Sequence, residues 1–358
     1  MIASGQRHAG LCWPRAHQRL LLRVLCGDVE RAGTELAAWQ RAVDLARLDA
    51  GSLALMPLLH RRIVELGLRS DLAPLLKGAY RWRWCENQLL LRSALPVLAG
   101  FCADRIPVLA LKGLALLRRY GDLALRPLSD VDVLVPRPHA PALIRALPAA
   151  GWRARADDGP APERTEARLA ETHAAGFVRG RAEIDLHWAS LAEDLSPGGD
   201  QRLWSRATPV AVSIPGARGP GVPLRVPSDA DLLLQVCVHG ARWSRASAIT
   251  WVPDALLILR GDPPGFDWST LLAEARARRL QVPLAETLRF LREELDAPIP
   301  GHVLPALEAE APGWLYWSEY FARSAPPGRA TTADRAAARL AQIVRAGGTL
   351  PAGFAAPG

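Results

Sequence analysis

The sequence contains very little lysine. Among its 358 residues only Lys77 and Lys112 are lysines, so arginine supplies nearly all of the 44 basic side chains. The formal net charge is +8, and a positive balance can attract nucleic acid or phosphates. The arginines are scattered along the chain without a basic block, however, so solvated helix faces account for most of them. Nucleic acid is therefore an allowed but not a favoured partner.

Cysteine is also scarce, and its pattern excludes two kinds of small, cross-linked domain. The cysteines are odd in number, and no two of them have C-x-x-C spacing; they are Cys12, Cys26, Cys85, Cys102 and Cys237. Neither a disulfide framework nor a zinc ribbon is indicated by such a set. We expect the cysteines to serve as small core residues.

Long apolar runs and a targeting segment are missing as well. No run approaches the roughly 18 apolar residues that a membrane-spanning helix needs. The N-terminal stretch lacks the charged, apolar, then small order of a secretory signal. The expectation is a protein with no membrane partner, located in the cytoplasm.

Helical periodicity dominates both ends of the chain. Apolar residues recur at three- and four-residue steps from about residue 15 to 107, with short breaks at Gly27-Asp28, Gly51-Ser52 and Ser70-Asp71. The same periodicity returns from about 229 to 295, after a helix cap at Ser228. These patterns predict an N-terminal helical region, a catalytic core, a C-terminal helical region and a low-complexity tail, at residues 1–104, 105–225, 226–322 and 323–358.

The middle of the chain has a different pattern. "IPVLALKG" predicts a short strand, "LALLRRY" a short helix, and "SDVDVLVP" a second strand. A helix interrupted at Pro148 follows, then a polar loop at 156–168, and then "HAAGFVRGRAEIDLHWAS", which predicts a hairpin. One or two short strands complete the segment. The predicted class is α+β, with a small mixed sheet and helices, flanked by the two helical regions.

Two aspartates, Asp130 and Asp132, stand one residue apart in the second of these strands. Strand interiors reject aspartate, so the pair either marks a loop edge or holds a cation. Residues two apart on a strand point the same way, and two carboxylates can share one hard cation such as Mg²⁺. Two such ions can clamp the attacking and leaving oxygens of a phosphoryl displacement. In the alternative, both aspartates have only a structural role: Asp130 caps the strand end and Asp132 is exposed to solvent.

Residues around this pair strengthen the cation hypothesis. Gly113 permits a close backbone approach by a phosphate at a helix N-terminus, and Lys112 could add a positive charge there. Asp185 shares a face of the predicted hairpin strand with Glu183 and His187. If that strand neighbours the first, Asp185 completes a three-carboxylate cluster.

Taken together, these residues resemble the nucleotidyltransferase superfamily typified by DNA polymerase beta and the aminoglycoside nucleotidyltransferases. Its pattern is a glycine turn, two acidic residues alternating with apolar ones, and a third acidic residue on a later strand. The chain is more closely similar to an uncharacterised bacterial nucleotidyltransferase family. The motifs that carry this resemblance are Leu111-Lys112-Gly113, Tyr120, Arg126-Pro127, Asp130, Asp132, Asp185-Leu186-His187-Trp188, His239-Gly240 and Trp251-Val252-Pro253-Asp254.

The resemblance implies a polymerase-beta-like core that moves a nucleoside monophosphate (NMP) group from a nucleoside triphosphate (NTP), such as ATP, to a hydroxyl-type acceptor. The acceptor, a small molecule, peptide or protein, is not identified, and pyrophosphate is released. Two Mg²⁺ ions are implied, with Asp130 and Asp132 ligating both and Asp185 ligating the catalytic ion and helping to deprotonate the acceptor. The implied nucleotide-binding residues are Lys112, Gly113, Arg126 and Ser129. Acceptor-side roles are implied for His187, His239 and Asp254.

Several of these residues could instead have a purely structural role. Arg126 could reach the triphosphate or only pair with Asp130, and His187 could be a structural histidine. His239 is better explained as a core histidine, and Asp254 as a cap of its own helix.

The chain also departs from the superfamily at Leu114, where a serine usually follows the turn glycine. Two other functions stay open, the first because the acceptor is unknown and the second because of Leu114. One is a toxin-like nucleotidyltransferase acting on tRNA or protein. The other is a catalytically degenerate fold that serves as a scaffold or nucleotide sensor.

Overall fold

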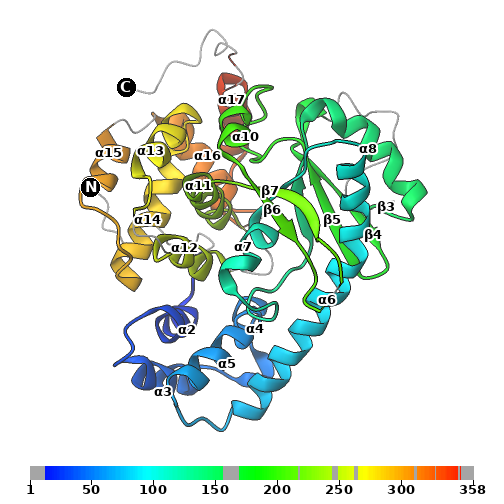
Figure 1. Cartoon of the computed structure of the whole chain (residues 1–358). Helices are drawn as coiled ribbons and strands as arrows, with labels where there is room; N and C mark the ends of the chain where they lie inside the picture. The colour runs from blue at the N-terminus through cyan, green and yellow to red at the C-terminus, as the bar shows by residue number, and fades with distance from the viewer. Residues whose placement is uncertain are drawn as a thin grey trace. The chain divides into compact units, whose positions relative to one another are not determined.

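The computed structural model describes residues 13–155, 169–216, 218–243, 249–261, 265–309, 313–326, 328–345 and 347. The predicted loop at 156–168 and the end of the predicted tail lie outside the described residues. The chain forms two compact units: residues 78–232, here called the sheet unit, and residues 1–77 with 233–358, here called the helical unit (Figure 1). The four segments predicted from the sequence stay a prediction.

The sheet unit is built on one seven-stranded mixed sheet in the order β3-β4-β5-β2-β1-β7-β6 (Figure 1). The pairs β2–β5 and β1–β7 are parallel, and the other neighbouring strands are antiparallel. This mixture confirms the predicted α+β class. The strands are β1 (Leu109–Ala110), β2 (Val131–Leu134), β3 (Arg153–Ala154), β4 (Ala174–Arg179), β5 (Ala182–His187), β6 (Thr208–Val212) and β7 (Val222–Val226).

The centre of the sheet is buried on both faces. Every residue of β1 and β2 is buried, including Asp132 among the apolar residues of β2. Leu109, Leu111 and Leu134 pack together with Leu203 and Ala207 in one apolar cluster. This packing makes β1 and β2 a rigid support for whatever side chains lie at their ends.

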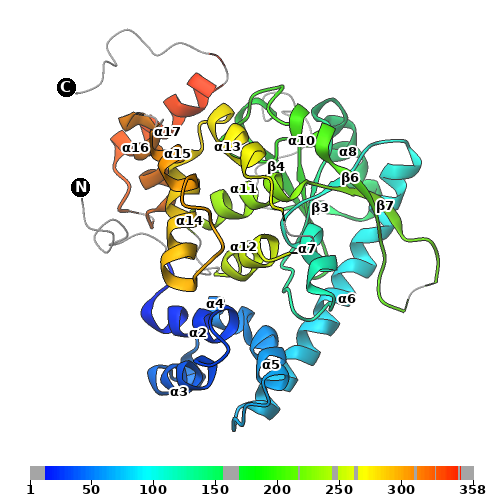
Figure 2. The same ribbon diagram turned by 60° about the vertical axis from the view of Figure 1, so that its left-hand side comes forward.

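Helices surround the sheet within the same unit. They are α7 (Lys112–Tyr120), α8 (Ala140–Ala146), α10 (Gln201–Arg206), the short 3₁₀ turns η2 (Arg137–His139) and η3 (Leu147–Ala150), and all but the first turn of α6 (Ala73–Ala103). Helix α6 runs alongside the sheet in both views (Figure 1, Figure 2). It is tied there by an ion pair of 3.7 Å between Glu86 and Arg181 and by a hydrogen bond of 3.4 Å from the Cys102 thiol to the Pro223 carbonyl. Helix α8 gives way to η3 next to Pro148, so the predicted interruption is confirmed.

The helical unit contains no strand among its described residues. Its helices are α2 (Ala16–Cys26), α3 (Ala32–Ala42), η1 (Leu45–Arg47), α4 (Ala50–Ala54), α5 (Met56–Glu65), most of α11 (Asp229–Gly240), α12 (Trp251–Leu259), α13 (Trp268–Ala277), α14 (Gln281–Leu295), α15 (Val303–Ala309), α16 (Trp314–Ser324) and α17 (Thr332–Arg345). Trp13, Trp251 and Phe290 form an aromatic cluster in its core, with ring centroids 5.4 to 5.9 Å apart.

Two local predictions about helix ends had opposite outcomes. The Ser228 hydroxyl accepts a hydrogen bond of 3.3 Å from the Asp231 amide, which confirms the cap of α11. The predicted break at Gly51-Ser52 is wrong, because both residues lie inside α4. Asp49 caps that helix by accepting a hydrogen bond of 3.0 Å from the Ser52 amide, so a helix starts where two small residues indicated a break.

Across the part of the chain that the structure describes, no helix has both the length and the apolar character needed to cross a membrane.

Candidate active site

The strands β2 and β5 bring two carboxylates side by side at the centre of the sheet. They are parallel neighbours, and their register places Asp132 directly opposite Asp185. On β5 the apolar Ile184 and Leu186 are fully buried, so the alternation of the strand turns Asp185 and His187 to the other face. The condition set by the sequence, that the hairpin strand should neighbour the first acidic strand, is therefore met.

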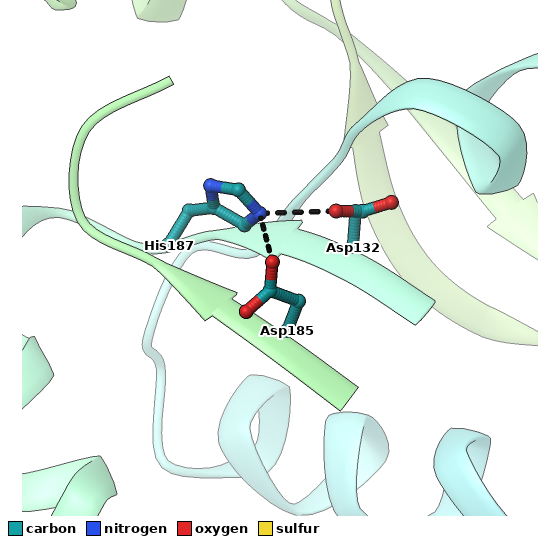
Figure 3. Close-up of side chains that lie close together, drawn as sticks. All are labelled: Asp132, Asp185 and His187. Atoms are coloured by element: carbon teal, nitrogen blue, oxygen red, sulfur yellow. Dashed lines mark hydrogen bonds and ion pairs between the residues drawn. The ribbon is translucent and has the colours of Figure 1, made fainter. Parts of the chain in front are cut away.

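His187 joins the two carboxylates (Figure 3). Its Nε2 atom lies 3.0 Å from Oδ1 of Asp132 and 3.2 Å from Oδ2 of Asp185. Each of the three residues offers one potential ligand atom, and all three atoms lie within 4.8 Å of one another. Two carboxylate oxygens and one imidazole nitrogen are ligands for a divalent cation, so these three residues could hold a metal ion.

Lys112 meets the same aspartate from the other side. Its Nζ lies 2.6 Å from Oδ1 of Asp132, the oxygen that also faces His187. Lys112 is the first residue of α7, and its φ of +43° is uncommon for a residue with a side chain. The amide of Leu111 donates a hydrogen bond of 3.0 Å to the Asp132 carbonyl, which fixes this turn against β2. The lysine is thus held in a costly backbone conformation beside the carboxylates.

The charges of this cluster are mutually dependent. Burial alone would raise the pKa of Asp132, but the nearby Lys112 charge and the His187 hydrogen bond lower it well below its usual range. Burial likewise opposes a lowered pKa for Asp185, and the His187 hydrogen bond again prevails. Burial would lower the pKa of His187, yet its hydrogen bonds to both carboxylates raise it. The pKa of Lys112 is raised by Asp132 in spite of burial. The two carboxylates and the two basic groups therefore stabilise one another's charged forms.

Asp130 occupies a different position from the one predicted. The strand begins at Val131, so Asp130 lies in the bend before it, where its Oδ1 accepts a hydrogen bond of 2.9 Å from the Ser129 hydroxyl. Partial burial, together with repulsion from Asp132, raises its pKa to about 6. In the described residues, the close group of potential ligand atoms comprises Asp132, Asp185 and His187, with Asp130 outside it.

Gly113 is required by protein packing. A Cβ atom at this position would lie 2.6 Å from Cδ2 of Leu128 and 3.5 Å from the guanidinium of Arg126. Arg126 also donates a hydrogen bond to the Pro127 carbonyl. The missing side chain therefore lets the segment before the aspartates come close to the first turn of α7, with Arg126 beside it.

Asn87 is a structural partner of the site that the sequence analysis missed. It is fully buried on α6, and its Nδ2 donates hydrogen bonds of 2.6 Å to the Leu123 carbonyl and 2.8 Å to the Arg126 carbonyl. Its Oδ1 accepts a hydrogen bond of 3.1 Å from the Leu128 amide. The segment that leads to Asp130 is therefore held by one side chain. Little in the sequence distinguished Asn87, because it stands between two other polar residues, Glu86 and Gln88.

Two of the predicted acceptor-side residues lie in the helical unit. His239 is exposed near the end of α11, so its interpretation as a core histidine is wrong. Asp254 is buried in the first turn of α12, whose N-cap is Thr250, so its interpretation as the cap is also wrong. Their acceptor-side roles stay a prediction.

The ordered motifs correspond to a known family. Residues 35–296 match the model of a family described as uncharacterised nucleotidyltransferases, which is well over half of the 358 residues. The chain belongs to this family. The matched residues of this nucleotidyltransferase include the lysine–glycine turn, the paired aspartates and the later acidic strand. No curated protein matches the chain.

Two solved structures are similar to parts of the chain. One is an antigenic nucleotidyltransferase-like protein from Paracoccidioides brasiliensis, with 18% identity and a TM-score of 0.37 over 60% of this chain and 96% of that one. The other is the antibiotic-resistance factor ANT(2'')-Ia in a solution structure, with 16% identity and a TM-score of 0.34 over 57% of this chain and 97% of that one. At such scores neither similarity contributes to the argument about function.

Proposed function

We propose that this nucleotidyltransferase moves an NMP group from an NTP to a hydroxyl-type acceptor, with the help of a divalent metal. The observation that carries the proposal is the register of β2 and β5, which places Asp132 opposite Asp185 with Lys112 at 2.6 Å. Two carboxylates and a lysine beside a helix N-terminus provide for both the metal and the phosphates of a nucleotide. The acceptor is a small molecule, a peptide or a protein.

In the proposed reaction an acceptor oxygen forms a bond to the α-phosphorus while the bond to the departing pyrophosphate breaks. Asp132 and Asp185 would hold the metal, with Asp130 close by, and the bound metal would supply positive charge to the transferring phosphoryl group. Asp185 accepts the acceptor proton and then loses it to solvent. Lys112 leaves Asp132 and binds the phosphate oxygens, whose negative charge keeps the ammonium protonated there.

Leu114 is the residue at which the motif departs from the superfamily pattern, because a serine usually stands at this position. Its side chain is 3% exposed and belongs to the core of the sheet unit. It cannot replace a hydroxyl that holds a phosphate, so phosphate binding depends on Lys112, the α7 N-terminus and Arg126. A nucleotide sensor without activity remains the second candidate because of this residue.

Transfer of label from an α-phosphate-labelled NTP to components of a lysate tests the proposal. We expect labelling by the wild type and none by Asp132→Asn, since the amide cannot provide the charge for the metal. Asp104→Asn is the matched control, because Asp104 is an exposed aspartate of the sheet unit, and it should label normally. Equal labelling by wild type and Asp132→Asn would refute the assignment.

Calorimetric titration of the NTP with and without Mg²⁺ tests the remaining alternatives. A sensor binds the nucleotide but transfers no label. A pure scaffold does not bind the NTP, either with or without Mg²⁺. A labelled tRNA or protein band, with growth arrest that disappears in Asp130→Ala, would support the toxin-like function.

A further inference from the structure

The ligand atoms that the structure gathers include a nitrogen in addition to carboxylate oxygens. The imidazole of His187 is fully buried, and its Nε2 faces Oδ1 of Asp132 at 3.0 Å and Oδ2 of Asp185 at 3.2 Å (Figure 3). Neighbouring ligands of an octahedral ion with bonds of about 2.1 Å lie about 3.0 Å apart. Both nitrogen–oxygen distances are therefore compatible with atoms that share one small ion.

The polar contacts of the imidazole run through Nε2. Its other nitrogen, Nδ1, is buried and has no hydrogen-bond partner among the residues that the structure describes. The ring of His173 lies edge-on at 5.2 Å and contributes packing. A structural histidine in a core usually uses both nitrogens, because an unpaired buried nitrogen is costly. An unpaired Nδ1 is costly in a metal ligand as well, so the role of His187 is inferred from the two contacts of Nε2 with the carboxylates.

We propose that Nε2 of His187 is a direct ligand of the divalent ion held by Asp132 and Asp185, and that the site prefers a first-row transition ion such as Mn²⁺ or Co²⁺ to Mg²⁺. The preference follows from the donor set, because Mg²⁺ selects oxygen ligands whereas imidazole nitrogen suits the transition ions. Binding releases the Nε2 proton to solvent, since only the neutral imidazole can donate its lone pair to a metal. The inference deepens the proposed function, on which it rests for the place of the ion at the reaction centre.

Lys112 is the protein group that competes with the ion. Its ammonium lies 2.6 Å from the same Oδ1 of Asp132 that faces Nε2. The ion and the ammonium cannot both occupy that oxygen at close range, because their charges repel. Loading of the site therefore requires the lysine side chain to move off the aspartate.

The alternative role for His187 is positioning: a hydrogen-bond bridge that orients both carboxylates without touching the metal. The two roles predict different metal selectivities. A positioning histidine supports binding of any divalent ion to a similar degree, whereas a ligand supports the transition ions in particular.

Pulsed electron paramagnetic resonance on the full chain loaded with Mn²⁺ separates the roles directly. We expect nitrogen coupling from a bound imidazole in the wild type and in His173→Gln, the neighbouring histidine that serves as control. The coupling should be lost in His187→Gln. A wild type that binds Mn²⁺ in the site without nitrogen coupling would overturn the proposal, and this result needs no variant to fold.

Calorimetric affinities supply the second readout. His187→Gln should weaken Mn²⁺ and Co²⁺ binding about 10- to 100-fold, the range found when groups that support metal ligands are removed. Mg²⁺ binding should change by less than about threefold, since oxygen ligands remain. Equal losses for all three ions would assign His187 to positioning only. Neither experiment includes nucleotide transfer. If the protein shows imidazole coupling but transfers no label, the proposed function is refuted and this inference still holds.

Discussion

Replacing Lys112 with methionine should strengthen metal binding and weaken nucleotide binding. The side chain keeps a similar length but loses the ammonium that lies 2.6 Å from Oδ1 of Asp132. In the wild type a metal must displace this contact, and a hydrogen bond to a charged group is worth about 1.5 to 3 kcal/mol. Since about 1.4 kcal/mol corresponds to a factor of ten, the variant should bind Mn²⁺ about 10- to 100-fold more tightly in the absence of nucleotide.

The nucleotide should respond in the opposite direction. Without the ammonium, one charge-assisted contact to the phosphates is lost, so NTP affinity at saturating metal should fall about tenfold. Isothermal titration of the metal alone, and then of the NTP, measures both effects. Lys77→Met is the matched control, because Lys77 is the other lysine of the chain and lies exposed in the helical unit.

The fold should survive the substitution at Lys112. Asp132 is 5% exposed and Lys112 is 24% exposed, and His187 remains on the same carboxylate oxygen after the lysine is removed. Metal affinity that stays the same or falls in Lys112→Met would refute the reasoning, because the ammonium would then not occupy a position that the ion needs.

Three further perturbations test the surroundings of the site. Gly113→Ala places a Cβ 2.6 Å from Cδ2 of Leu128, so the free energy of unfolding, measured in urea, should fall by about 1 to 3 kcal/mol. Asn87→Ala leaves the backbone groups of residues 123–128 without their partner and should cost about 2 to 4 kcal/mol in the same assay. Asp130 lies close to the proposed metal and has a pKa raised to about 6, so its protonation below that value should add a loss of up to about tenfold per pH unit in metal affinity to the loss that the His187 proton causes. Calorimetric titration of the metal at values from about pH 5 to about pH 7 measures this change in affinity.

Each of these expectations can fail in a recognisable way. A Gly113→Ala variant as stable as the wild type would mean that Leu128 moves aside at little cost. An Asn87→Ala variant with unchanged stability would mean that water replaces the amide. Asp130→Asn should make the pH dependence of metal binding below about pH 6 weaker and leave only the part due to the His187 proton, whereas an unchanged dependence would assign the second proton to another group.

Local sequence pattern was sufficient to predict the acidic strand pair. The alternation in residues 182–187 predicts that Asp185 and His187 share one face, and the valines on either side of Asp132 predict that the opposite face of its strand is core. These features depend on the period of a strand, which is encoded residue by residue. The pairing of Asp132 with Asp185 then followed once the two strands were neighbours.

Contacts between distant segments could not be predicted in the same way. Asn87 lies on α6, some 36 to 41 positions before its partners, and nothing in the local pattern identifies what a single polar residue in a helix will contact. The ion pair between Lys112 and Asp132 depends on the unusual backbone at the start of α7. Asp130 was placed in the strand because strand ends are the least certain part of a pattern, and the pairing in fact begins at Val131.

Periodicity also failed to predict burial at a helix end. His239 follows eight buried positions of α11, 231–238, and was therefore interpreted as a core residue. The helix ends at Gly240, where a Cβ would lie 2.4 Å from the indole of Trp251, so close packing is continued by the glycine and the histidine is turned to solvent. The difference arises because a few degrees of helix rotation decide which side of a terminal turn is covered.

The account depends on a divalent ion bound where Asp132 and Asp185 meet. Crystals grown with Mn²⁺ and a non-hydrolysable NTP, recorded at a wavelength where manganese scatters anomalously, locate that ion directly. We predict an anomalous peak in contact with both carboxylates, with the Lys112 ammonium moved from Asp132 to the phosphates. A nucleotide bound with its manganese elsewhere, and with Lys112 still paired to Asp132, would contradict the account.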